Sequence, residues 1–251
     1  MTVVNLSLSE IHDLALEAFT QNGCDPQNAG ALTRTVVAAE RDGSHSHGLF
    51  RVPGYVASLR SGKVNGAADP QISNKSPVIV NANGDDGYAP LAIERGIPAL
   101  AKAASEFGIA VMTLTHTHHF AALWPEVEAL AEQNLAGMAC VSYMPNVAPH
   151  GSNKPLFGTN PLAFAWPRKN KPPFVFDMAT SAMAGGDVAI AARDGHSVPL
   201  GTGLDENGNE TTDPAAILKG VLLPFGGHKG SAIATMVELL AAGATGERFS
   251  Y

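Results

Sequence analysis

Apolar residues near the start of the chain recur at the three- and four-residue spacing of amphipathic helices. Ser7 and Glu10 have the spacing of a capping box, and we expect the helix that they begin to end at Gly23. Its apolar positions are Ile11, Leu14, Ala15, Ala18 and Phe19. Residues 26–43 follow the N-cap candidate Asp25 and predict a second helix with a proline in its first turn.

Beyond residue 75, short apolar runs alternate with longer helical patterns. Strands are predicted at residues 76–80, 109–115, 137–142, 161–165 and 174–176, the last four of them buried. Helices are predicted at residues 88–107, 122–133, 181–193 and 231–242. Strands interleaved with helices indicate an α/β layered fold. We expect a helical N-terminal region at residues 1–75 and an α/β domain at residues 76–251.

Composition narrows the class of protein. The chain has 251 residues, 45% of them hydrophobic, which suffices for a large core in one or two domains. The net charge is −7 and the basic residues are scattered, so the sequence has no electrostatic footprint for nucleic acid. Cys24 and Cys140 match no metal or redox spacing and are expected to be reduced thiols. Without a secretory or membrane-spanning pattern, a cytoplasmic protein is expected.

Residues 44–55 read SHSHGLFRVPGY and are the segment that most clearly suggests chemistry. In a helix, His47, Arg51 and Tyr55 would lie on one face, although Pro53 interrupts such a helix. A histidine can transfer a proton near neutral pH, and an arginine one turn away can bind a carboxylate with two nitrogens. The segment therefore predicts a site that binds a small organic acid. The alternative is a simple helix entry, with Ser46 as its cap and the histidines exposed.

A second cluster, THTHHFAALW, covers residues 115–124 at a strand-to-helix junction. Its histidines lack the spacing of a zinc motif, so a metal site is not expected. The backbone N–H groups of Phe120, Ala121 and Ala122 would be free at the start of a helix and suited to phosphate. An ordinary junction with a histidine cap is the alternative.

Two further clusters carry candidate ligands. PFGGHKGSA, at residues 224–232, combines glycines with Lys229 directly before a helix and could hold a phosphate, or be only a turn. Its spacing is not that of a Walker A loop. FDMATSAMAGGDV, at residues 176–188, contains Asp177 at a strand end and Asp187 in a helical pattern. A carboxylate here could orient His47, or simply satisfy a helix start.

Six motifs follow one another along the chain: SHSHGLFR, HHFAALW, PHGSNKPLFGTNPLAFAWP, FDMATSAMAGGDV, TTDPAAIL and LLPFGGHKGSA. In this order they resemble the malate/L-lactate dehydrogenase-like oxidoreductase family over nearly the whole chain. The resemblance implies an α/β fold with a non-Rossmann NAD(P)-binding sheet, which fits the missing G-x-G-x-x-G fingerprint, and a homodimer. Within the family, the motifs are most similar to those of bacterial enzymes that use NADPH to reduce the cyclic imino acids Δ1-piperideine-2-carboxylate and Δ1-pyrroline-2-carboxylate.

Carried over by position, the resemblance implies roles for individual residues. His47 would donate the proton, with Ser46 and Asp187 in a charge-relay arrangement, and Arg51 would bind the substrate carboxylate. Further substrate-binding positions would be Thr159, Gly185 and Gly186, with Gly185 standing where close relatives carry a bulkier polar residue. The cofactor-binding positions would be His119, Phe120, Ala121, Ala122, Leu123, Asp177, Met178, Ala179, His228 and Lys229.

Two other functions stay open at this point. A 2-hydroxy-acid dehydrogenase, acting on malate, lactate or ureidoglycolate, would use the same histidine and arginine on a carbonyl group. Family members also continue past residue 251, so an inactive remnant that binds nucleotide or only dimerises is a third possibility. A hydrolase is disfavoured because no G-x-S-x-G motif is present.

Overall fold

The computed structural model describes residues 4–119 and 121–251, which form two compact units that divide between residues 135 and 136. The mixed α/β organisation predicted from the alternating pattern is confirmed in the helices and sheets below. The domain boundary expected after residue 75 lies inside the first unit, one residue before the end of a strand. No helix in the described ranges is both long and apolar enough to cross a bilayer.

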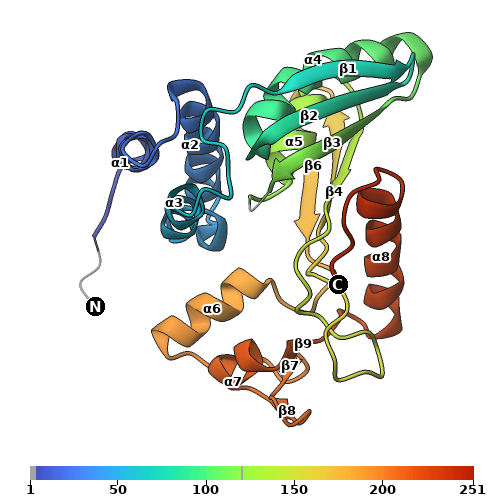
Figure 1. Ribbon diagram of the computed structural model, residues 1–251. Helices are drawn as coiled ribbons and strands as arrows, with labels where there is room; N and C mark the ends of the chain where they lie inside the picture. The colour runs from blue at the N-terminus through green and yellow to red at the C-terminus, as the bar shows by residue number, and fades with distance from the viewer. Residues whose placement is uncertain (1–3, 120) are drawn as a thin grey trace. The chain divides into compact units, whose positions relative to one another are not determined.

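The first unit begins with three helices, α1 (Leu8–Thr20), α2 (Pro26–Arg41) and α3 (Val52–Arg60), which Figure 1 shows together. The predicted capping box is confirmed, with the Glu10 N–H donating to the Ser7 hydroxyl at 3.2 Å and the Ser7 N–H donating to the Glu10 carboxylate at 2.8 Å. Asp25 caps α2 as expected. Apolar faces of these helices meet in a core that includes Phe19, Leu32, Val36, Tyr55 and Tyr88.

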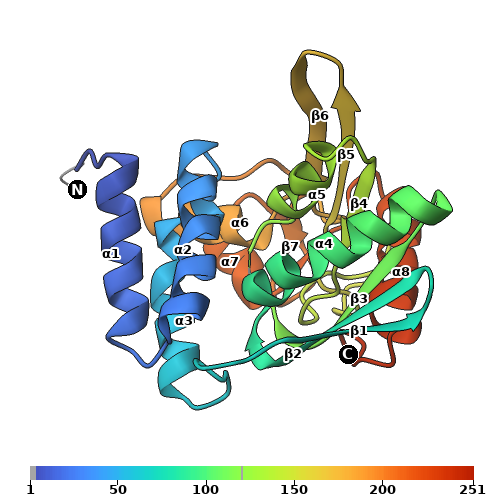
Figure 2. The ribbon, with the colours of Figure 1, turned by 90° about the horizontal axis from the view of Figure 1, so that it is seen from above.

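The sheet of the first unit has the order β1 (Gln71–Ser76), β2 (Ile79–Tyr88) and β3 (Val111–His118). Strands β1 and β2 form an antiparallel hairpin, whereas β2 and β3 are parallel. Helix α4 (Ala89–Phe107) connects β2 to β3 in the chain and packs on the sheet, as Figure 2 shows. The predicted C-terminus of this helix is confirmed, because Gly108 has a φ of 83° in the left-handed region. The unit ends with α5 (Trp124–Ala131).

The strand predicted at residues 76–80 is wrong, because the hairpin turn between β1 and β2 falls inside it. Strand β1 reads QISNKS and lies on an edge, where polar residues are tolerated, so it has no apolar alternation to detect. Strand β2 contains NANGDDGY, a composition typical of turns. Its Asp85 and Asp86 have positive φ of 52° and 55°, at the irregularity in the pairing with β3.

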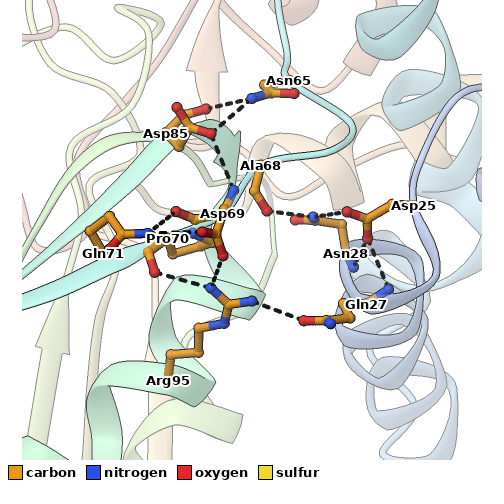
Figure 3. Close-up of polar contacts among 10 residues, drawn as sticks. All are labelled: Asp25, Gln27, Asn28, Asn65, Ala68, Asp69, Pro70, Gln71, Asp85 and Arg95. Atoms are coloured by element: carbon orange, nitrogen blue, oxygen red, sulfur yellow. Dashed lines mark hydrogen bonds and ion pairs between the residues drawn. The ribbon is translucent and has the colours of Figure 1, made fainter.

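A polar network joins the helices of the first unit to its sheet (Figure 3). Arg95 on α4 donates to the Asp69 carboxylate at 2.5 Å and to the Gln27 side chain on α2 at 2.9 Å. Asp85 on β2 accepts hydrogen bonds from the Asn65 side chain and the Asp69 backbone, at 3.0 and 3.1 Å. These bonds hold the connection from α3 to β1 against both α2 and α4.

The second unit has a separate antiparallel sheet of β4 (Gly137–Cys140), β5 (Leu162–Arg168) and β6 (Lys171–Met178). The positions of these strands confirm the predictions at residues 137–142, 161–165 and 174–176. The prediction that the strands are buried is only partly confirmed. One face carries the buried alanines Ala163 and Ala165, and the other carries Met138, Trp166 and Phe174, which are 59%, 56% and 51% exposed. The apolar runs therefore form a one-sided sheet with a partly exposed apolar face.

Helices and short strands complete the second unit. They are α6 (Gly185–Asp194), β7 (Gly203–Leu204), β8 (Glu210–Thr211), α7 (Pro214–Lys219), β9 (Val221–Leu222) and α8 (His228–Glu238), which continues as the π-helical turn Leu239–Gly243. Helix α6 begins four residues later than predicted because the Ala182 N–H donates to the Leu223 carbonyl. Helix α8 begins three residues earlier than predicted, directly after the Gly226–Gly227 turn.

Candidate active site

The segment with the candidate proton donor is not one continuous helix. Two 3₁₀ turns, η1 (His45–His47) and η2 (Leu49–Arg51), meet at Gly48 and lead into α3. Pro53 lies in the first turn of α3, where its missing N–H is tolerated. The expectation that His47, Arg51 and Tyr55 share a helix face is therefore wrong. Tyr55 is only 2% exposed, and its carbonyl accepts a hydrogen bond from the Tyr88 hydroxyl at 2.6 Å.

Two serine hydroxyls hold the His47 ring. The Nδ1 atom of His47 lies 3.2 Å from the Ser46 Oγ and 3.3 Å from the Ser44 Oγ. Ser46 is buried within η1 and does not lie at an N-cap position, so the interpretation of Ser46 as a simple helix cap is wrong. Because the ring nitrogen is engaged by neighbouring hydroxyls, the orientation of the imidazole is restricted.

Arg51 is tied to the same serine. Its Nε donates to the Ser46 carbonyl at 2.8 Å, which fixes the plane of the half-buried guanidinium. Within the described ranges, its two terminal nitrogens have no protein partner. The group is thus oriented by the protein while its terminal nitrogens can still bind a carboxylate with two parallel hydrogen bonds.

The second cluster of the first unit includes the end of β3 and the start of α5. The His119 side chain is only 8% exposed, and its Nε2 lies 2.5 Å from the Glu126 carboxylate. The Nδ1 of His116 lies 3.4 Å from the Asp86 carboxylate. Helix α5 begins at Trp124, two residues later than predicted, with Pro125 in its first turn. The N–H groups of Ala121 and Ala122 therefore belong to the loop and do not form the expected helix start. Phe120 lies outside the described residues.

The structure brings these two clusters together. The Trp124 indole N–H donates to the Asp42 carboxylate at 3.0 Å, across 82 positions of sequence. Arg41 also pairs with Asp42 and lies 3.8 Å from Glu128 on α5. The Arg41 hydrogen bond, with a smaller contribution from Trp124, holds the pKa of the Asp42 carboxyl below its usual range. Helix α5 is thus linked to the end of α2, just before the His47 segment.

In the second unit, Thr159 and Gly185 lie near each other. A Cβ atom added to Gly185 would be 3.9 Å from the Thr159 methyl and 3.4 Å from the Asn146 amide nitrogen. Asn146 was not expected from the sequence, and its Oδ1 is a buried oxygen without a partner in the described parts of the chain. The one feature of the sequence that could have pointed to Asn146 is its position just before the motif that starts at Pro149. Gly185 and Gly186 form the first turn of α6, and the exposed Asp187 follows in the same turn.

The end of β6 and the start of α8 also lie together. The Phe225 N–H donates to the Thr180 carbonyl at 3.0 Å, which places the segment after Asp177, Met178 and Ala179 beside the glycine-rich turn. A Cβ on Gly230 would come within 2.8 Å of the Thr180 carbonyl oxygen, so the close approach requires glycine.

The glycine-rich turn presents exposed cationic and imidazole groups. His228 and Lys229 are exposed on the first turn of α8, behind Gly226 and Gly227 with φ of 54° and 61°. His150, which the sequence did not single out, lies beside His228 with ring centroids 6.1 Å apart. The predicted placement of the turn before a helix is confirmed, and its phosphate binding stays a prediction.

Comparison with known proteins gives one consistent result. The malate/L-lactate dehydrogenase family model matches residues 6–251. A Δ1-pyrroline-2-carboxylate/Δ1-piperideine-2-carboxylate reductase from Pseudomonas putida is 51% identical over all of this chain and 74% of its own length. The solved structure of Δ1-piperideine-2-carboxylate reductase from Pseudomonas syringae pv. tomato is similar with a TM-score of 0.95 and 48% identity, over 99% of this chain and 75% of that one. A sulfolactate dehydrogenase from Methanocaldococcus jannaschii has a TM-score of 0.84 and 32% identity, over 94% and 69% of the two chains.

Proposed function

Because the chain belongs to the malate/L-lactate dehydrogenase family, we propose that it is an NADPH-dependent reductase of cyclic imino acids. It would convert Δ1-piperideine-2-carboxylate to L-pipecolate and Δ1-pyrroline-2-carboxylate to L-proline. The names of its relatives at about half identity support this substrate class. The observation that carries the proposal is the pairing of an oriented histidine with an oriented arginine through Ser46.

The proposed roles follow from the chemistry of the substrate. Arg51 binds the carboxylate with its terminal nitrogens and thereby places the adjacent C=N bond. A bound nicotinamide would supply a hydride to the carbon of this bond. The nitrogen would take the electron pair of the C=N bond. The His47 imidazolium would supply the proton that the product amine carries on this nitrogen, or keep that proton in place if the bound substrate is already protonated. Ser46 orients His47, and Asp187 is proposed as the second member of the relay. Thr159, Gly185 and Gly186 are proposed to contact the substrate.

The residues proposed for the cofactor suit a dinucleotide. A dehydrogenase family implies a nicotinamide cofactor. Lys229 and His228 are exposed at the start of α8, and the glycines before them have no side chains that would keep a phosphate away from the backbone. We assign the remaining contacts to residues 119–123 and 177–179. Among the named strands of the described residues, β2 and β3 are the only two that pair with each other in parallel, which supports a binding mode other than a Rossmann sheet.

A homodimer is proposed as the assembly. The sheet β4–β6 exposes Met138, Trp166 and Phe174 on one face. Exposed apolar side chains gathered on one face are typical of a protein–protein interface, which supports a partner subunit there.

The likeness to sulfolactate dehydrogenase favours one alternative, reduction of a 2-oxo acid by the same residues. A spectrophotometric assay of NADPH oxidation separates the two functions, with piperideine-2-carboxylate, pyrroline-2-carboxylate, pyruvate and oxaloacetate compared side by side. We expect kcat/KM to be at least tenfold higher for the cyclic imines. Preference for pyruvate or oxaloacetate would favour the dehydrogenase, and no oxidation with any substrate would favour the inactive remnant.

A further inference from the structure

Glu40, one residue before the end of α2, connects this helix to both 3₁₀ turns of the His47 segment. Its side chain is only 13% exposed. One carboxylate oxygen accepts the Leu49 backbone N–H at 2.7 Å, and the other lies 2.7 Å from the His45 Nδ1. A single carboxylate thus contacts η1 through His45 and η2 through its first N–H.

Gly48 makes room for this carboxylate. A Cβ atom added at Gly48 would overlap the Glu40 carboxylate, and it would meet only Glu40 atoms among its three nearest neighbours. Gly48 is itself buried at the junction of η1 and η2. The glycine and the glutamate therefore form one packing unit at the point where the two turns change direction.

The contact with Leu49 has a clear energetic basis. The Leu49 N–H is at the start of η2, where no carbonyl of the same turn can accept it. A carboxylate at this position forms a charge-assisted hydrogen bond and also interacts favourably with the N-terminal end of the turn. Without Glu40, both the direction of η2 and the position of Arg51 at its end would be less restricted.

We propose that Glu40 is a positioning residue that sets the geometry between His47 and Arg51. His47 is the last residue of η1 and Arg51 is the last residue of η2, so the angle between the turns determines the separation of the two side chains. Glu40 contacts neither substrate nor cofactor in this account. The proposal rests on the proposed function of His47 and Arg51, and it names the group that makes this pair rigid.

Two variants at Glu40 test the proposal kinetically. Glu40→Ala should lower kcat/KM by roughly ten- to a hundredfold, since a displacement of about 1 Å at reacting groups can have an effect of this size. The loss should include a raised KM for the imino acid, while the Kd for NADPH stays unchanged. Glu40→Gln should restore most of the activity because its amide oxygen can still accept the Leu49 N–H.

Glu94→Ala is the matched control, because Glu94 also contacts α2, through Arg34, but far along the helix from the His47 segment. It should leave both kinetic constants unchanged. A Glu40→Ala enzyme with unaltered KM and a kcat reduced only in proportion to its folded fraction would overturn the proposal. So would a Glu40→Gln variant as impaired as Glu40→Ala.

A double-mutant cycle examines the same contact from the other side. Gly48→Ala should impair kcat/KM about as much as Glu40→Ala, because the new methyl displaces the carboxylate. In the Glu40→Ala background, Gly48→Ala should have little further effect, since the obstructing atoms are gone. Losses that multiply in the double variant would contradict a shared mechanism.

A readout independent of turnover separates this proposal from the proposed function. The ring resonances of His47, assigned with His47→Ala, should shift in the NMR spectrum of Glu40→Ala and stay in place in Glu94→Ala. Unchanged resonances would overturn the positioning role even if the enzyme reduces imines. Shifted resonances in a protein that oxidises no NADPH would support the positioning role and reject the proposed function.

Discussion

At the scale of single residues, Ser46 is the link between the two groups proposed to act on the substrate. Its hydroxyl oxygen lies 3.2 Å from the His47 Nδ1, and its carbonyl accepts a hydrogen bond from the Arg51 Nε at 2.8 Å. Because both contacts are made by one residue, a change in the His47 segment should affect proton transfer and carboxylate binding together. The two functions can still be separated by changing His47 or Arg51 alone.

We expect His47→Ala to remove most turnover and to leave NADPH binding nearly intact. General acid catalysis contributes about 10²–10⁴-fold, so kcat should fall within this range. Steady-state kinetics with a cyclic imine and fluorescence titration of NADPH measure the two quantities. A loss of kcat below tenfold would count against His47 as the proton donor.

Arg51→Lys tests the carboxylate contact. Lysine keeps the charge but cannot make the forked, two-nitrogen contact, so KM for the imino acid should rise by roughly tenfold or more. The Kd for NADPH should change much less. An unchanged KM would reject Arg51 as the carboxylate-binding group.

At the scale of elements, the start of α2 and the end of α4 were predictable because their signals are local. Asp25 accepts the N–H groups of Gln27 and Asn28 at 2.9 and 2.8 Å, as its place before Pro26 predicted. Gly108 ends α4 for an equally local reason. Strand β1 was missed because its edge sequence QISNKS has no apolar alternation. The start of α6 was missed because it depends on a backbone hydrogen bond from Ala182 to Leu223, far along the chain.

Asp25→Ala should lower the free energy of unfolding by about 1–2 kcal/mol, because the first N–H groups of α2 lose their acceptor. For a protein of this size the Tm should fall by roughly 2–4 °C for each kcal/mol. Asp13→Ala, which changes an exposed aspartate on α1, is the control and should leave Tm within about 1 °C. Equal Tm values for the two variants would show that the cap contributes nothing.

The turn before α8 makes a prediction about the cofactor. Lys229→Ala should weaken NADPH binding by on the order of 1.5–3 kcal/mol, or roughly ten- to a hundredfold in Kd, and make the remaining affinity less sensitive to salt. Fluorescence titrations at low and high salt measure both effects. Identical Kd values for the variant and the unaltered protein at both salt concentrations would mean that residues 226–230 are only a turn.

At the scale of the whole molecule, the candidate site depends on contacts that no local pattern contains. Asp42 and Trp124 join two segments of the first unit, and Thr180 and Phe225 join two segments of the second. The sequence motifs named most of the residues involved, but not which of them become neighbours. The sequence did not single out Glu40, Asn146 or His150, because the residues that they lie beside, at positions 49, 185 and 228, belong to other segments of the chain.

In the proposed reaction, this chain transfers a hydride from NADPH to the C=N carbon of a cyclic imino acid. The most direct test supplies NADPH carrying deuterium at both C4 positions and analyses the product by mass spectrometry. We expect the unaltered chain to form L-pipecolate and L-proline with one deuterium at C2, and the His47→Ala variant to form far less of both. Products without deuterium, or label that appears only in lactate or malate when 2-oxo acids are supplied, would contradict it.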